Sequence, residues 1–77
     1  MDHHLRRRAV AARLEELSVD ALLITRLLHT RYLSGFTGSN GQVLIRPGEA
    51  LFLTDGRYTE QSRREVPDLE RHTCVNP

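Results

Sequence analysis

The chain contains no lysine and no tryptophan, and it has one cysteine among its 77 residues. A single cysteine excludes an internal disulfide and a cysteine-based metal cluster. We predict that Cys74 is an inert, buried thiol in a strand, and this cysteine usage favours a reducing cytoplasm. The absence of lysine excludes a P-loop, whose phosphate-binding motif requires one. No apolar run approaches the roughly 18 residues that a membrane helix needs, so no membrane partner is expected.

The residues that are present are typical of one small globular domain. Hydrophobic residues make up 39% of the chain and charged residues 27%, and the formal net charge is +1. This balance gives no reason to expect a polyanionic partner. A domain of this length buries only about 60% of its unfolded surface, so its stability is marginal unless something else covers it.

Hydrophobic periodicity and turn residues predict alternating helices and strands. Residues 3–17 and 57–65 are expected to form helices, and Pro67 stops the second. A short helical turn is expected over residues 27–33. Strands are predicted at residues 21–24, 42–46, 50–54 and 69–75.

The strand pattern predicts a particular fold class. Because residues 21–24 are an uninterrupted apolar run, we expect that strand to be buried on both faces of a sheet. Pro47 and Gly48 are expected to form the tight turn of a hairpin. The whole order predicts an α/β fold with a mixed β-sheet flanked by helices. So few helices would leave one face or edge of the sheet open to a partner.

The segment LSGFTGSNGQVLI, residues 33–45, places three glycines before a strand. Gly35, Gly38 and Gly41 are evenly spaced by three, so they do not match the dinucleotide-binding fingerprint, and the loop precedes a strand instead of a helix. A nucleotide is therefore not expected here.

A serine-hydrolase triad is the second interpretation of this loop. Ser39, Asp55 and His72 occur in the chain order of α/β-hydrolase triads. The nucleophile elbow requires glycine two residues before the serine, however, and that position is Thr37. We therefore expect Ser39 and Asn40 to bond the backbone of their own loop.

The histidines offer no predicted metal site. His3 and His4 are adjacent, so they point to different faces of a helix and cannot chelate together. His29 and His72 have no obvious carboxylate partner at ligand spacing. We predict no metal ion and no cofactor in this chain.

Arg6, Arg7, Arg8 and Arg13 form a basic run on the first helix, which could contact nucleic acid. No aromatic residue lies among them, so we predict a solvated helix face and no nucleic-acid partner. Binding through this run stays an alternative, which predicts a steep salt dependence. Because cations in the first turn of a helix oppose its dipole, these arginines could also answer an acidic neighbour elsewhere in the fold.

A second motif, LTDGRYTEQ, spans residues 53–61. Asp55 and Gly56 predict a turn from a strand into a helix, with Asp55 as the helix cap and Tyr58 packed inward. The functional alternative is that Arg57 offers its fork of donors to a carboxylate.

Together the segments RYLSGFTGSNGQVLI and LFLTDGRYTEQ closely resemble the N-terminal domain of Xaa-Pro aminopeptidases (aminopeptidase P), in the creatinase/prolidase superfamily. The resemblance extends from about residue 6 to residue 75 and covers nearly the whole chain. It implies a truncated creatinase-type N-terminal domain over residues 1–77, with the metallopeptidase catalytic domain absent. The catalytic domain of the family holds two divalent metals, usually manganese, and removes the first residue of peptides with proline second.

The resemblance also implies partners and site residues. In the family this domain builds a dimer or tetramer and lies beside its own catalytic domain and a neighbouring subunit's active site. By that analogy Phe36, Arg57 and Tyr58 are the predicted substrate-binding positions, whereas no catalytic residue or metal ligand is expected. Two alternatives remain: a stand-alone protein- or peptide-binding module of this fold, and the N-terminal domain of an Xaa-Pro dipeptidase (prolidase).

Overall fold

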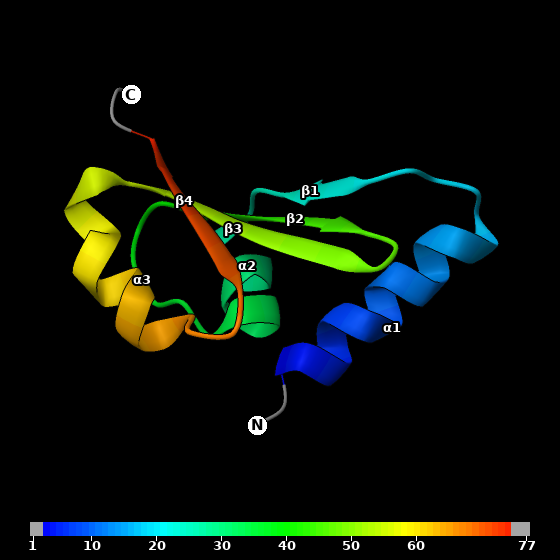
Figure 1. Ribbon diagram of the computed structural model, residues 1–77, viewed down its shortest axis with the longest axis horizontal. Coiled ribbons are helices and arrows are strands. Elements are labelled where there is room, and N and C mark those ends of the chain that lie inside the picture. The colour runs from blue at the N-terminus through cyan, green and yellow to red at the C-terminus, as the bar shows by residue number, and fades with distance from the viewer. Residues whose placement is uncertain (1–2, 75–77) are drawn as a thin grey trace.

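The computed structural model describes residues 3–74, which form three α-helices and a four-stranded sheet (Figure 1). The elements in chain order are α1 (His3–Glu16), β1 (Leu22–Ile24), α2 (Leu27–Ser34), β2 (Gly41–Arg46), β3 (Glu49–Asp55), the 3-10 turn η1 (Gly56–Tyr58), α3 (Thr59–Glu65) and β4 (Glu70–Cys74). Within this part of the chain no helix has the length and apolar character needed to cross a membrane.

The sheet has the strand order β1-β2-β3-β4. β1, β2 and β3 pair antiparallel, whereas β4 pairs parallel to β3 after the crossover through α3. The predicted mixed α/β sheet is therefore confirmed. The helical turn expected over residues 27–33 is α2, which ends one residue later than predicted. Thr30, Leu33 and Ser34 are all buried along one side of it.

One face of the sheet carries the core. Val43, Ile45 and Phe52 alternate with half-buried residues along β2 and β3, and each is at most 1% exposed. All three helices contribute to covering this face, with Leu14 from α1, Leu33 from α2, and the residue after α3, Val66. Alternation with a period of two is what a strand with one covered face requires.

The opposite face has no helix over it among the described residues. Leu44, Leu51 and Leu53 on this face are half-buried, and Leu23 of β1 is 48% exposed. The expectation that residues 21–24 are buried on both faces is therefore wrong. β1 is an edge strand with one neighbour. We expected an open face or an open edge, and within residues 3–74 the sheet has both.

The hairpin between β2 and β3 forms as predicted. The register places Arg46 opposite Glu49, so Pro47 and Gly48 are the two turn residues. Gly48 has φ of 82°, which a glycine adopts without steric cost. Proline followed by such a glycine is the pattern of a type II turn.

Gly41, the first residue of β2, lies against two aromatic rings. A Cβ atom there would come 2.8 Å from Phe36 Cδ2 and 2.9 Å from Phe52 Cζ. We expect Gly41→Ala to lower the free energy of unfolding by about 1–3 kcal/mol because it overpacks the core. Gly56→Ala is the matched control, since its Cβ would meet nothing within 4 Å, and it should change stability by less than about 0.5 kcal/mol. Urea unfolding of both variants measures the difference, and equal stabilities would contradict the close packing.

Candidate functional site

The glycine loop and the DGRY motif meet at one end of the β2–β3 pair. The Ser39 hydroxyl and the Tyr58 hydroxyl share a hydrogen bond, and the Ser39 amide donates to the same phenol oxygen at 3.2 Å. Asn40 Nδ2 donates to Asp55 Oδ2 at 2.7 Å. Fifteen and nineteen residues of chain separate these partners. We call Ser39, Asn40, Asp55, Arg57 and Tyr58 the loop–corner cluster.

Asp55 organises this cluster. Its carboxylate caps η1 by accepting from the Arg57 amide at 2.9 Å, as predicted. It also accepts from Arg57 Nε at 3.1 Å and from Arg57 Nη2 at 2.8 Å. The Arg57 and Asn40 hydrogen bonds hold the pKa of Asp55 well below its ordinary value, and the Asp55 hydrogen bond raises the pKa of Arg57. The Arg57 guanidinium is therefore paired with Asp55, two residues before it in the chain. The Arg57 side chain nevertheless remains 70% exposed.

Phe36 supports the cluster from beneath. It is 2% exposed, with its ring centroid 4.8 Å from that of Phe52 and 5.4 Å from that of Tyr58, in an edge-on arrangement with the latter. Tyr58 is half-buried and packs inward as expected. Hydrogen bonds from Ser39 lower the pKa of the Tyr58 phenol. Of the three predicted substrate-binding residues only Arg57 is exposed, and their role in binding stays a prediction.

A second polar brace ties the glycine loop to α3. Glu65 accepts from the Thr37 amide at 2.8 Å and from the Thr37 hydroxyl at 2.9 and 3.0 Å, and Gln61 Nε2 lies 3.2 Å from the same hydroxyl. Burial alone would raise the pKa of Glu65, but the Thr37 and Gln61 hydrogen bonds outweigh it and lower the pKa. The residues of this brace are 24 and 28 positions apart, and no local pattern in the sequence indicates it.

The prediction that the arginines of α1 form a solvated face is wrong for Arg7. Its side chain is 4% exposed, forms an ion pair with Asp68, and donates from Nη1 to the Leu33 carbonyl at 2.8 Å. Burial opposes ionisation of Asp68, but the Arg7 hydrogen bond and charge lower its pKa overall. The acidic neighbour suggested by the unfavourable position of Arg7 in the helix dipole is therefore present.

Two other basic residues at this end of α1, His3 and Arg6, bind the end of α2. Arg6 Nη1 donates to the Tyr32 carbonyl at 2.9 Å, His3 Nδ1 lies 3.1 Å from the same oxygen, and the Arg6 guanidinium stacks 4.0 Å above the Tyr32 ring centroid. The last carbonyls of a helix have no partner within it and carry partial negative charge. Arg6 and His3 therefore supply donors to the Tyr32 carbonyl at the end of α2.

The structure does not assemble the rejected hydrolase triad. Asp55 accepts hydrogen bonds from Asn40 and Arg57. Ser39 is hydrogen-bonded to Tyr58. His72 Nε2 lies 2.6 Å from Glu70 Oε2. Within residues 3–74 no three His, Cys, Asp or Glu side chains come close enough to hold a metal ion. Cys74 is the last residue of β4, which lies within the strand predicted at residues 69–75. The predicted burial of its thiol concerns a side chain outside the described part of the structure.

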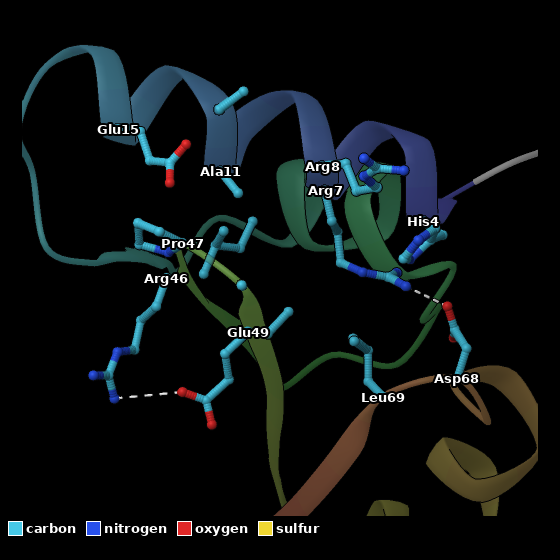
Figure 2. Close-up of a pocket in the computed structure, with 14 residues that line it drawn as sticks. His4, Arg7, Arg8, Ala11, Glu15, Arg46, Pro47, Glu49, Asp68 and Leu69 are labelled. Carbon is cyan, nitrogen blue, oxygen red and sulfur yellow. Dashed lines mark hydrogen bonds and ion pairs between the residues drawn. The ribbon is translucent and has the colours of Figure 1, made fainter.

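A groove of about 580 Å³ separates α1 from the β2–β3 hairpin (Figure 2). The Arg7–Asp68 pair closes one end and the Arg46–Glu49 pair, at 3.4 Å, lies at the other. The remaining charges that line it include both signs, and small apolar side chains such as Ala11 lie between them. Because its charges largely cancel, this groove offers no selective attraction for a ligand of either sign.

Three comparisons place this geometry among known proteins. A sequence model of the creatinase/prolidase N-terminal domain family matches residues 6–74. The crystal structure of a creatinase/prolidase-like N-terminal domain of a metallopeptidase from Corynebacterium diphtheriae superposes with a TM-score of 0.91 at 47% identity, covering 96% of this chain and 60% of that one. The uncharacterized peptidase YqhT of Bacillus subtilis is 46% identical over 55 residues, which are 71% of this chain and 16% of that protein. The Xaa-Pro aminopeptidase app-1 of Caenorhabditis elegans is 47% identical over 36 residues, which are 47% of this chain and 6% of that protein.

Proposed function

This chain belongs to the creatinase/prolidase N-terminal domain family, and we propose that it is the non-catalytic N-terminal part of an Xaa-Pro aminopeptidase of the cytoplasm. The chain spans 16% of its bacterial relative and 6% of its worm relative. We therefore assign peptide hydrolysis, and the two divalent metals that it needs, to a catalytic domain outside the matched region. The metals are proposed to be Mn²⁺, and the reaction is removal of the residue that precedes proline.

The loop–corner cluster is the observation that carries a role for this domain at the substrate site. Arg57 is the exposed cation of the cluster, and two hydrogen bonds to Asp55 hold its guanidinium in a fixed orientation. A donor that is already ordered loses less entropy on binding than a free side chain. We propose that Arg57 and Tyr58, supported by Phe36 beneath them, lie at the rim of a peptide site built by the catalytic domain.

The second proposed role is assembly. The open sheet face and the half-exposed edge strand β1 leave apolar side chains available to a neighbouring chain or domain. The proposed partners are this protein's own catalytic domain and a neighbouring subunit, in a homodimer or tetramer. An Xaa-Pro dipeptidase would use the same kind of N-terminal domain. The length of the peptides that are cleaved distinguishes dipeptidase activity from aminopeptidase activity.

The test uses one peptidase assay with two arms. The purified 77-residue chain should release no residue from an Xaa-Pro peptide, with or without Mn²⁺, and turnover would overturn the assignment of catalysis elsewhere. In the complete peptidase, Arg57→Ala should raise KM about threefold to tenfold with little change in kcat, as expected for the loss of one charged hydrogen bond at a partly solvated rim. Arg63→Ala is the matched control, because Arg63 is also exposed, at 61%, but lies on α3. Equal KM values for the two variants would remove Arg57 from the rim.

A further inference from the structure

The two residues that precede β2 hold the two groups that flank the Arg57 guanidinium. Asn40 Nδ2 donates to Asp55 Oδ2 at 2.7 Å, and the same carboxylate accepts from the guanidinium. Ser39 bonds the Tyr58 hydroxyl, and the guanidinium carbon of Arg57 lies 5.3 Å from the centroid of the Tyr58 ring. The charged partner and the aromatic partner of Arg57 are thus both fixed from the glycine loop.

These contacts differ from the ones that the sequence predicts. We expected Ser39 and Asn40 to bond the backbone of their own loop, and that expectation is wrong for both side chains. They bond Tyr58 and Asp55, which lie nineteen and fifteen residues further along the chain. Both loop residues are exposed, so water would satisfy their polar atoms equally well. Burial therefore does not explain why the Asn40 amide is bonded to a carboxylate.

The glycine loop does not depend on the Asn40 side chain for its own position. Thr54 Oγ1 donates to the Asn40 carbonyl, which fixes the end of the loop beside β3. Nearer the start of the loop, the Thr37 amide and hydroxyl both donate to Glu65 on α3. Removing the Asn40 amide group would leave these contacts in place. The group that would lose a partner is the Asp55 carboxylate.

Both oxygens of the Asp55 carboxylate are held. Oδ1 accepts from the Arg57 amide at 2.9 Å and from Arg57 Nε at 3.1 Å. Oδ2 accepts from Arg57 Nη2 at 2.8 Å and from Asn40 Nδ2. Among the described donors to this carboxylate, Asn40 is the one that does not belong to Arg57 itself. Asn40 therefore fixes the plane of the carboxylate relative to the rest of the domain.

The ion pair between Asp55 and Arg57 is too weak to order the guanidinium without that support. The Arg57 side chain is 70% exposed, and an ion pair at such a site contributes little because water competes for both charges. A carboxylate whose plane is fixed presents its two oxygens to Nε and Nη2 in one orientation. A donor that is ordered in this way loses less entropy when it binds.

We propose that Asn40 is a positioning residue for substrate binding, which fixes the Asp55 carboxylate and through it orients the Arg57 guanidinium toward the peptide. The donors of Arg57 that Asp55 does not use remain for an acceptor oxygen of the peptide. This inference rests on the role proposed above for Arg57 at the rim of the peptide site. It adds a residue that acts through its neighbours and makes no contact with the reacting atoms.

The first test uses the 77-residue chain and needs no peptide. Exchange of the Arg57 Nε proton with water, measured by NMR, becomes slower when its hydrogen bond to Asp55 persists. Asn40→Ala should accelerate this exchange by at least about threefold. Thr37→Ala is the control, because it removes a hydroxyl contact of the same loop with Glu65 and leaves the partners of Asp55 in place. Circular dichroism verifies that both variants are folded, and an unchanged exchange rate in Asn40→Ala would overturn the proposal.

The second test is a double-mutant cycle in the complete peptidase. Asn40→Ala should raise KM about twofold to fourfold with little change in kcat, because it loosens the guanidinium without removing it. In the Arg57→Ala background the same substitution should leave KM unchanged, since no guanidinium remains to be positioned.

The cycle separates failure of this inference from failure of the proposed function. If Arg57→Ala raises KM but Asn40→Ala has no effect, or raises KM by the same factor in both backgrounds, Asn40 does not act through Arg57 and only the positioning role is overturned. If Arg57→Ala alone leaves KM unchanged, the rim role of Arg57 is overturned and the positioning role with it.

Discussion

Replacing Phe36 by alanine is expected to lower the free energy of unfolding by about 3–5 kcal/mol, the usual cost of deleting a buried aromatic ring. Phe36 is 2% exposed, packs against Phe52 and Tyr58, and lies against the positions where Gly38 and Gly41 have no side chain. A domain of 77 residues has a total stability of roughly 4–12 kcal/mol. The substitution therefore removes a large part of it. Urea unfolding followed by circular dichroism measures the loss.

Two further variants make this prediction specific to packing. Phe36→Leu keeps an apolar side chain in the same space and should cost less than alanine. Leu28→Ala removes a side chain that is 71% exposed, and should change stability by less than about 0.5 kcal/mol. A Phe36→Ala protein as stable as Leu28→Ala would show that the ring does not support the loop–corner cluster.

Asp68→Asn is expected to destabilise the domain by about 1–3 kcal/mol at neutral pH. Removing one partner of a buried ion pair costs about 3–5 kcal/mol, but Asp68 is 46% exposed, so water compensates part of the loss. Arg7 would remain buried, with the Leu33 carbonyl as its other acceptor. Chemical unfolding at pH 7 measures the difference from the parent chain, and Glu70→Gln, on the exposed part of β4, is the control. A loss no larger than that of the control would mean that Arg7 does not depend on Asp68.

The pH dependence of this difference follows from the lowered pKa of Asp68. A carboxyl with a lower pKa in the folded state stabilises the protein fully above its unfolded pKa, which is about 3.9. That contribution is lost as the pH falls through the folded value. The stability gap between the parent chain and Asp68→Asn should therefore be constant above about pH 5 and become smaller toward pH 2. A gap that is equally large at pH 2 and pH 7 would exclude the charge of Asp68 as its cause.

Much of the fold could be predicted because the determining interactions are local. The hairpin depends on Pro47 and Gly48 between two apolar runs. The helix cap depends on a carboxylate two residues before the amide that it binds, as in Asp55 and Arg57. Strand β2 begins one residue before its predicted start and ends where predicted, and β3 is one residue longer than predicted at each end. The resemblance carried by the glycine loop and the DGRY motif also identified the family that the comparisons confirm.

Other features were decided only by the tertiary structure, because their partners are distant in the chain. Arg7 and Asp68 are 61 residues apart, so nothing near either residue shows that a basic run on a helix contains a buried cation. The exposure of β1 depends on its place at the edge of the sheet and not on its apolar composition. The sequence by itself determined which short segments turn, extend or coil. The folded chain decided which charges are buried and that Gly38 and Gly41 are glycines because the Phe36 ring fills the space beside them.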